Sequence, residues 1–484
     1  MSELQRHIQQ LIQKNDIPRA LMLCKQACRS HPADPEAWQW LGQLQLSTGD
    51  FKNAVTSLER QVRLQPDNTA AWFNMGVAAL KQGRIRRGME CLARVIEIDP
   101  QRADAVLALA ELHKSNKDYD TAMRILRDGL DASPDDIRLN WLLGLCLQDI
   151  GRLTEGMMFF GKACRLMRAI TATVTHVYPT RDAPGETFKN TAAHKLQHDM
   201  EQFEYLVGKG LLPPEYLDEA DKYRAARGHY EMRGGPATIA PLTRNDQARI
   251  GGTYNRMVYD SSRGLRQERA LNTHVDWQEA VARYRENTPG ITYIDDLLLP
   301  DVLEELYAYC LESTIWYDYR HEGYVGAYAD DGFDCPLLIQ IADELRAAMP
   351  ELLADNPLRF MWAYKYDSRL QGIGNHADSA EVNVNFWITP DECNLDPDHG
   401  GLVVYRAEAP ASWDFEKYNN DRPAIRDYLE KHDCGSVKIP YRRNRAVIFN
   451  SDLFHETDRF QFVDCYDCRR INITMLFGDR KGRT

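Results

Sequence analysis

Small and apolar residues recur with one period through the first 170 positions of the chain. Three registers share a spacing of 34 residues: Pro32, Pro66, Pro100 and Pro134; Gly42, Gly76, Ala110 and Gly144; and Ala20, Ala54, Gly88, Ala122 and Gly156. Small residues at fixed offsets let two helices pack closely, and each proline stops the helix that precedes it. The pattern predicts a row of helix pairs, with turns at Gly49, Gly83 and Gly151.

This period resembles the tetratricopeptide repeat, in which each 34-residue unit is a helix-turn-helix pair. Trp38 and Trp72 match its aromatic position, and residues 1–34 read as a less regular first unit. The fourth unit is degenerate, because Lys117 replaces the turn glycine and Val106 replaces the Trp. The resemblance implies an all-α superhelix with a concave groove. Either the groove binds an extended or helical segment of a protein, or the repeats serve assembly or pack on the rest of the chain.

The middle segment, residues 171–285, loses the period. Its start, residues 171–187, is rich in proline and glycine and reads as a linker, and two helical patterns follow. His194 and His198 are four positions apart, a spacing that can hold zinc in His-Glu-x-x-His proteins. Because no Glu follows His194, we expect an exposed helix face instead of a metal site.

The last 200 residues change to short runs of β-forming residues. A short strand at Ile291–Ile294 and two helices, Pro300–Thr314 and Pro336–Ala348, are followed by predicted strands at Phe360–Tyr366, Val382–Ile388, Gly401–Arg406, Ser436–Ile439, Ala446–Phe449 and Arg470–Phe477. This order predicts an α+β domain over residues 286–484, dominated by a double-stranded β-helix (jelly roll). The chain is therefore expected to be multidomain, with a helical superhelix over residues 1–170 and a linker and helical segment between the two.

Polar and apolar residues alternate along two of these strands. The polar faces carry Asn383, Asn385 and Trp387 in one strand and Arg470, Asn472 and Thr474 in the other. Residues two apart on a strand point to the same side of the sheet. An inward polar face in a jelly roll is costly unless something binds there.

His376 and Asp378 are also two residues apart, so both can reach one ion from an extended chain. His455 lies 77 residues beyond Asp378, just after the apolar run 446–449. Two imidazoles and one carboxylate cover three adjacent positions of an octahedron and leave three open, as in non-haem iron(II) oxygenases. We expect these three residues to be the metal ligands.

Arg470 follows His455 by 15 residues and begins one of the alternating strands. A guanidinium on that polar face could hold the far carboxylate of a dicarboxylate through a bidentate contact. Tyr366, ten residues before His376, could donate a hydrogen bond to the same carboxylate. We expect Arg470, Tyr366, Asn385 and Asn383 to bind the cofactor.

Residues from about 290 to 480 resemble a 2-oxoglutarate- and iron(II)-dependent oxygenase domain of the prolyl-hydroxylase-like type. The matching pieces are His376-Ala377-Asp378, the Gly400-Gly401-Leu402 turn, the run Asn444-Arg445-Ala446-Val447-Ile448-Phe449, His455 and Arg470. The resemblance implies iron bound by the two histidines and Asp378, and 2-oxoglutarate bound by Arg470. Arg469 is a rival for that role, but it would face the other way on the strand.

The resemblance further implies O2 as a cosubstrate, with ascorbate as a further candidate cofactor. The expected reaction is hydroxylation coupled to conversion of 2-oxoglutarate to succinate. Family members that halogenate replace the carboxylate of Asp378 with a small residue, so its presence favours hydroxylation. A helical insert near Phe415–Lys431 lengthens the interval before His455, and it leaves the substrate-facing loops unassigned.

Three functions remain open at this point. The chain could hydroxylate a protein or peptide recruited by the repeats, or a small molecule with the repeats used for assembly. It could also be a scaffold with an inactive oxygenase fold. A cupin-like metal protein without 2-oxoglutarate would not need Arg470.

Composition and charge narrow the partners. The formal net charge of -12 argues against nucleic acid as the main partner. The absence of an apolar run of about 18 residues argues against a membrane span, and the N-terminus lacks a secretory pattern. The 11 cysteines lie at irregular spacings, which favours a reducing cytoplasm, and Cys465 and Cys468 read as a reduced pair in a loop.

Overall fold

The computed structural model describes residues 2–170, 186–261, 267–370, 372–432 and 434–480. The chain forms two compact units, Met1–Cys146 and Leu147–Thr484. This division differs from the expected boundaries after residues 170 and 285. Most of the linker predicted over residues 171–187 lies outside the described residues.

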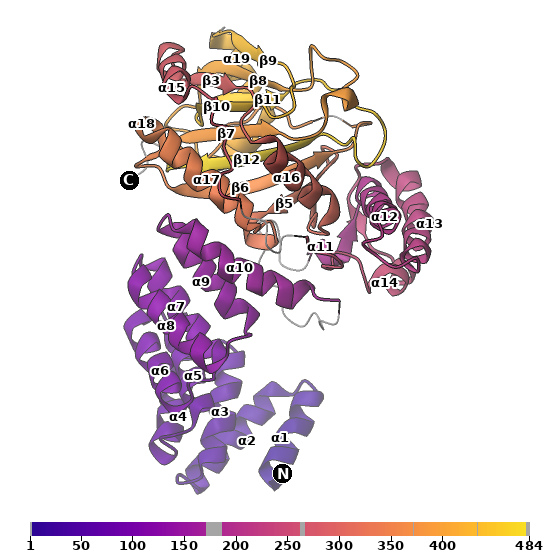
Figure 1. Ribbon diagram of the computed structural model, residues 1–484. Coiled ribbons are helices and arrows are strands. Elements are labelled where there is room, and N and C mark those ends of the chain that lie inside the picture. Colours follow the sequence, from indigo (N-terminus) through magenta and orange to yellow (C-terminus); the bar gives the residue numbers. More distant parts are fainter. Residues whose placement is uncertain (1, 171–185, 262–266, 371, 433, 481–484) are drawn as a thin grey trace. The chain divides into compact units, whose positions relative to one another are not determined.

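The first unit is built of helices that pack in consecutive pairs (Figure 1). They are α1 (Glu3–Gln13), α2 (Ile17–Ser30), α3 (Pro35–Ser47), α4 (Phe51–Leu64), α5 (Thr69–Lys81), α6 (Ile85–Ile98), α7 (Ala103–Ser115), α8 (Tyr119–Ala132) and α9 (Ile137–Asp149), which runs into the second unit. The second helix of each of the first four pairs ends two residues before a proline of the 34-residue register. The predicted helix pairs are confirmed.

The aromatic register of the repeat has a local structural role. Trp38 and Trp72 donate a hydrogen bond from Nε1 to the carbonyl of the proline six residues earlier, at 2.9 and 2.8 Å. Asn140 occupies the same register and makes the equivalent bond from its side-chain amide at 3.0 Å. Val106 has no group that can donate such a bond. The degenerate unit therefore lacks a contact that secures the loop to the next helix.

The turn register follows the expected backbone geometry. Gly49, Gly83 and Gly151 have positive φ angles of 78°, 74° and 77°. Lys117 takes the same conformation with φ 60°, although its Cβ disfavours it. The period thus imposes the turn even where the residue does not suit it.

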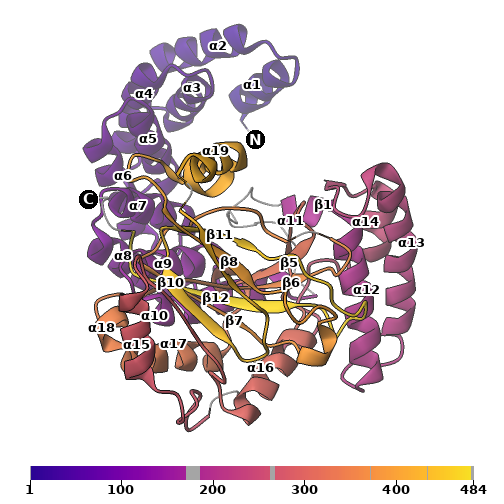
Figure 2. The same cartoon turned by 90° about the horizontal axis from the view of Figure 1, so that it is seen from above.

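The second unit contains helices on several sides of its sheets (Figure 2). They are α10 (Leu153–Arg168), α11 (Glu186–Lys189), α12 (Ala193–Gly208), α13 (Tyr216–Gly234), α14 (Arg244–Ile250), α15 (Trp277–Glu286), α16 (Pro300–Glu312), α17 (Pro336–Ala348), α18 (Pro350–Leu353) and α19 (Arg422–His432). Helices α12, α13 and α14 lie together in both views and share a buried core (Figures 1 and 2).

The expectation that His194 and His198 lie on an exposed helix face is wrong. Both side chains are buried in α12, at 1% and 0% exposure. The ring nitrogens of His194 lie 3.0 and 3.3 Å from the carbonyl oxygens of Pro236 and Tyr324, which can only accept, and burial lowers its pKa to about 4. His198 packs against the ring of Trp316. No local sequence pattern predicts this burial. Other segments of the second unit cover a helix face whose residues are polar.

Two antiparallel sheets form the centre of the second unit. The larger has the order β3-β10-β7-β12-β6-β5-β4 and the smaller β11-β8-β9. Their strands are β3 (Ile291–Ile294), β4 (Asp318–Tyr319), β5 (Tyr324–Tyr328), β6 (Leu358–Tyr366), β7 (Val382–Trp387), β8 (Leu402–Glu408), β9 (Ser436–Ile439), β10 (Ala446–Asn450), β11 (Leu453–Thr457) and β12 (Ile471–Phe477). A separate short pair joins β1 (Asn190–Thr191) to β2 (Ala240–Pro241).

Most predicted strands appear within two residues of their expected ends. The strands at residues 291–294 and 436–439 and the helix at 336–348 match the prediction. A region rich in antiparallel strands is therefore confirmed. Trp387 and Val447 of the larger sheet share one buried cluster with Val404 and Ile439 of the smaller sheet. The two sheets consequently pack face to face, and the site described next lies between them.

Candidate metal centre

The three expected metal ligands, His376, Asp378 and His455, converge in the second unit. His376 and His455 exchange two backbone hydrogen bonds, of 3.0 and 2.8 Å, although His376 lies outside the named strands. The amide of Asp378 donates to the carbonyl of Ser451 at 3.1 Å. One donor atom from each of the three side chains lies within 4.8 Å of the others. Long-range backbone pairing therefore builds the cluster from residues 77 positions apart in sequence.

The two imidazoles are oriented by main-chain carbonyls. His376 Nδ1 lies 2.9 Å from the carbonyl of Gly374, and His455 Nδ1 lies 3.0 Å from that of Leu453. A carbonyl only accepts, so each Nδ1 carries the proton and each Nε2 keeps its lone pair. These Nε2 atoms lie 4.0 and 3.5 Å from the carboxylate of Asp378. This is the tautomer and orientation that metal-binding histidines need.

The charge states also suit a divalent cation. Burial, together with the neighbouring His455, lowers the pKa of His376 to about 3, so the ring is neutral near neutral pH. Burial alone would raise the pKa of Asp378, but the adjacent rings of His455 and His376 and the charge of Arg422 keep it below its usual range. The cluster therefore offers a neutral nitrogen from His376 and an anionic oxygen from Asp378, the protonation states that metal binding requires.

A chain of amides supports Asp378 from behind. Asn383 donates to Oδ2 of Asp378 at 2.8 Å, and Asn385 donates to Asn383 at 2.5 Å. Asn472 and Thr474 donate in turn to Oδ1 of Asn385, at 3.1 and 2.6 Å. The expected polar face thus exists, and it fixes the orientation of the carboxylate. Asn385 lines the cavity, whereas Asn383 is fully buried behind the ligand.

A cavity of about 860 Å³ opens beside the cluster. Its walls include His376, Asp378 and His455, and it extends over strands of the larger sheet. This volume is in the range that holds drug-sized ligands. The cavity therefore has room for more than a small dicarboxylate.

Arg470 lines this cavity and is 2% exposed. Its Nε donates to the carbonyl of Gly400 at 2.7 Å, and Nη2 donates to that of Gly401 at 3.2 Å. Within the described part of the chain, no carboxylate lies within 4.0 Å of its guanidinium. Burial lowers the pKa of Arg470, as expected for a cation without an adjacent anion.

Tyr366 lies against Arg470, with the guanidinium carbon 4.8 Å from the centre of its ring. Both side chains line the cavity, so the two residues expected to bind one carboxylate are brought together. Arg469 instead pairs with Glu201 at 2.8 Å and with Asp367 at 3.6 Å. It faces away from the cavity, as expected from strand alternation.

An aromatic wall of the cavity was not foreseen from the sequence. Trp362 and Tyr364 of β6 and Tyr324 and Tyr328 of β5 line it alongside Tyr366. Neighbouring rings lie 4.4 to 6.4 Å apart between centroids. The available signal was an aromatic residue at every second position of β6. Pairing between β5 and β6 completes the wall, and that pairing has no local signature.

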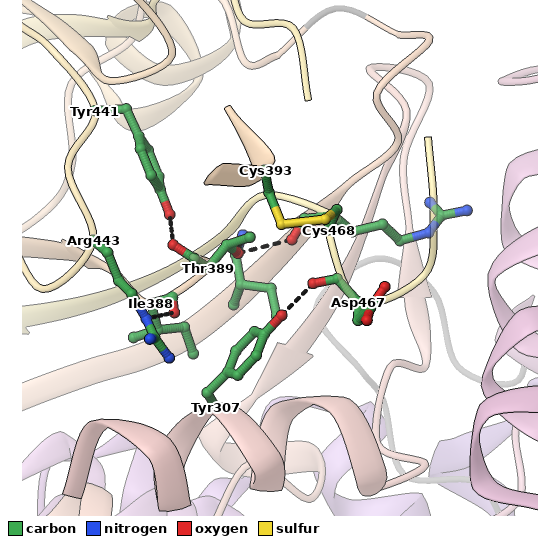
Figure 3. The surroundings of a disulfide bond; sticks show 10 residues. Tyr307, Ile388, Thr389, Cys393, Tyr441, Arg443, Asp467 and Cys468 are labelled. Atoms are coloured by element: carbon green, nitrogen blue, oxygen red, sulfur yellow. Dashed lines mark hydrogen bonds between the residues drawn. A yellow bond between two sulfur atoms is a disulfide. The ribbon is translucent and has the colours of Figure 1, made fainter. Parts of the chain in front are cut away.

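Cys468, in the loop before Arg470, forms a disulfide with Cys393 (Figure 3). The expectation of a reduced pair at Cys465 and Cys468 is wrong, because the partner of Cys468 lies 75 residues away and Cys465 is free. Near the disulfide, Thr389 donates from Oγ1 to the carbonyl of Arg469, the residue after Cys468, at 2.8 Å. The disulfide thus joins the segment after β7 to the segment that precedes Arg470.

Among the described residues, no helix is long and apolar enough to span a lipid bilayer.

Comparison with known proteins identifies the first unit. A family model of the tetratricopeptide repeat matches residues 11–75, 45–112 and 79–146. The N-terminal region therefore consists of tetratricopeptide repeats, an architecture that presents a surface for protein–protein interaction or scaffolding. Among curated proteins, none matches this sequence.

Solved structures also resemble part of the chain. A crystal structure of MamA protein is 24% identical, has a TM-score of 0.30, and covers 32% of this chain and 85% of its own. A MamA structure from Desulfovibrio magneticus RS-1 is 21% identical, with a TM-score of 0.31 and coverage of 34% and 93%. YrrB, described as a TPR protein with an unusual peptide-binding site, is 16% identical, with a TM-score of 0.29 and coverage of 32% and 80%.

Proposed function

We propose that the chain is an iron(II)- and 2-oxoglutarate-dependent dioxygenase that hydroxylates a protein or peptide recruited by its repeats. The observation that carries this proposal is the combination in one cavity of the His376, Asp378 and His455 cluster with the buried cation Arg470. Either feature alone has a simple structural interpretation. Together they match a metal that keeps open positions and a dicarboxylate that reaches it.

The fold supports this assignment. Two face-to-face antiparallel sheets with a shared core are the architecture of a jelly roll, which we propose for the second unit. The donor set of two imidazole nitrogens and one carboxylate oxygen suits iron(II). Amide support of Asp378 and carbonyl support of both histidines supply the outer contacts that such centres use.

The residues of the chain have distinct tasks in this function. Arg470 neutralises the distal carboxylate of 2-oxoglutarate, and Tyr366 donates a hydrogen bond to it. The aromatic wall keeps water from the oxidation site and holds the apolar part of a substrate. When bound, iron(II), 2-oxoglutarate and O2 supply the oxidation of an unreactive C–H bond, with release of succinate and CO2 and with ascorbate as a candidate reductant.

One observation favours a second function. The cavity of about 860 Å³ could enclose a whole small molecule, in which case the repeats would serve assembly. The intact cluster and the unpaired Arg470 argue against a purely structural second unit, because a buried cation without a ligand costs stability. We therefore rank peptide hydroxylation first, small-molecule hydroxylation second and the inactive scaffold last.

The test measures binding and turnover on the full chain. Calorimetric titration of 2-oxoglutarate into the Mn(II)-loaded protein should show binding that Arg470→Ala weakens and His376→Ala abolishes. The control Arg459→Ala removes an arginine whose side chain is 72% exposed, and it should bind as the parent does. Succinate release with iron(II) should follow the same order. Metal-independent binding, or equal affinity in Arg470→Ala and the control, would reject the assignment.

A further inference from the structure

The insert between β8 and β9 is attached to the metal cluster by its backbone. A short π-helix (Glu416–Asn420) precedes α19 in this insert. The amide of Ala377 donates to the carbonyl of Tyr418 at 3.0 Å, and the side-chain amide of Asn419 donates to the carbonyl of Ala377 at 2.9 Å. Ala377 lies between the ligands His376 and Asp378 in sequence. The insert therefore forms a fixed wall beside the metal site.

Arg422, the first residue of α19, projects from this wall and lines the cavity. Its Nη1 donates to the carbonyls of Asn375 and Asn419, both at 2.6 Å. These two bonds hold the guanidinium next to the residue that precedes His376. Its Nε and Nη2 donate no further hydrogen bond within the described residues. The guanidinium is thus held in place by Nη1, and its other two nitrogens can still donate hydrogen bonds.

The charge of Arg422 has no close counter-ion. No carboxylate of the described residues lies within 4.0 Å of it. Burial lowers its pKa, and among neighbouring charges Glu322 counteracts this most. The charge also reaches the cluster, since it contributes to the lowered pKa of both His376 and Asp378. Arg422 therefore sits close to the place where a substrate would be oxidised.

The other charges that line the cavity are mostly paired. Asp318 pairs with Arg320 at 2.8 Å, and Asp331 forms a bidentate pair with Arg168 at 2.7 and 2.5 Å. Under the proposed function, Arg470 is matched by 2-oxoglutarate. Among the described residues that line the cavity, this leaves Arg422 as the arginine available to a substrate, with Glu322 as a nearby carboxylate that competes for it.

We propose that Arg422 binds a carboxylate of the substrate and so selects an acidic substrate, a choice that rests on the proposed dioxygenase function. The planar fork of an arginine fits a carboxylate through two parallel hydrogen bonds. The apolar part of such a substrate packs on the aromatic wall. The carboxylate belongs either to an Asp or Glu side chain or to the C-terminus of a peptide.

The experiment uses the full chain loaded with Mn(II) and N-oxalylglycine, which fills the 2-oxoglutarate position. Stabilisation of the protein by these two probes tests the proposed function separately. Pools of acetylated tripeptides are then titrated, with Asp or Glu, Asn or Gln, or Lys or Arg at the central position and an amidated C-terminus. A fourth pool has neutral side chains and a free C-terminal carboxylate. Binding is measured by calorimetry.

We expect an acidic pool to bind at least about tenfold more tightly than the amide pool, since a hydrogen bond to a charged group contributes that much. Arg422→Met should remove this preference, and Arg422→Lys should keep part of it. Glu322→Gln should strengthen it, because it removes a competing negative charge. Circular dichroism checks the folding of each variant. The inference is overturned if no pool binds, if the basic pool binds best, or if Arg422→Met keeps the preference while Mn(II) and N-oxalylglycine still stabilise the chain.

Discussion

The two units of this protein obtain their structure in different ways. In the repeat unit, a residue is held by partners close in sequence: Trp38 and Trp72 each bond a carbonyl six residues away. In the second unit, the proposed metal ligands His376 and His455 meet through backbone pairing across 79 residues. Contacts between residues close in sequence allow the repeat fold to be predicted from the 34-residue period. The candidate metal site depends on contacts between distant residues, and no sequence period predicts those.

This difference determines how each unit should respond to damage. A repeat contacts mainly its neighbours, so a defect remains in one region. In the second unit, the side chains of the candidate site lie on segments that are held in place by contacts with residues distant in sequence. A substitution at one of those distant residues can therefore displace the site. The following predictions test that contrast, beginning with the largest expected effect.

The first prediction concerns the disulfide bond between Cys393 and Cys468. Its loss releases a loop of 75 residues, which costs about 4 kcal/mol in the chain-entropy model. The loop includes Gly400 and Gly401, whose carbonyls hold Arg470. In non-reducing buffer, Cys393→Ser should therefore lower the free energy of unfolding of the second unit and weaken the proposed binding of 2-oxoglutarate.

Denaturant titration, calorimetry and mass spectrometry of the cross-linked peptides provide the measurements. Cys434→Ser is the matched control, because Cys434 is exposed and free. If Cys393→Ser binds 2-oxoglutarate like this control, the disulfide does not position Arg470.

The second prediction concerns the core of the repeat unit. Leu58, in α4, is fully buried in a cluster that includes residues of α5 and α6. Leu58→Ala should lower the stability of the repeat unit by about 3 kcal/mol through lost burial and the remaining cavity. Hydrogen exchange should rise in the helices around α4, while 2-oxoglutarate binding by the second unit stays unchanged. A comparable loss of that binding would show that the units are not independent in this respect.

Much of the fold could be predicted from the sequence, for reasons visible in particular residues. The 34-residue registers specify helix ends and turns, including the strained turn at Lys117. Strand alternation placed Asn385 and Arg470 on the polar cavity side and Arg469 on the other. These features depend on short-range periodicity, which the sequence carries directly.

Other features depend on which distant segments meet. The aromatic wall requires Tyr324 to pair with Tyr366, and the disulfide requires residue 393 to reach residue 468. The burial of His198 depends on Trp316, which lies more than 100 residues away in sequence. No local sequence pattern predicts these contacts between distant segments. The candidate metal ligands could therefore be predicted from the sequence, whereas the residues that form the walls of the cavity could not.

The third prediction concerns a buried carboxylate in the second unit. Burial alone would raise the pKa of Asp367, but the hydrogen bond from Arg369 and the charge of Arg469 hold it at about 2. Because its folded pKa lies below the unfolded value of 3.8, Asp367 stabilises the fold above about pH 4 and loses this contribution as the pH falls toward 2. The contribution is about 2 kcal/mol.

Urea titrations between pH 2 and pH 7 measure this effect. Asp367→Asn should be less stable than the parent at pH 7, and the difference should shrink as the pH falls. Asp398→Asn changes an exposed turn carboxylate in the same unit and controls for general acid sensitivity. A difference that stays constant over this range would show that Asp367 is not the titrating group.

The smallest expected effect tests the local rule of the repeat unit. Lys117 adopts φ 60° in a turn where the other units have glycine. An L-residue in this conformation costs about 1 kcal/mol relative to glycine. Lys117→Gly should therefore raise the stability of the repeat unit by up to about 1 kcal/mol, with no effect on the second unit. The reverse change, Gly83→Ala, places a Cβ with nothing within 4 Å at φ 74° and should lower stability by a similar amount. Denaturant titrations of both variants measure the two shifts in stability. If both shifts have the same sign, the backbone conformation of the turn does not determine the stability of the repeat unit.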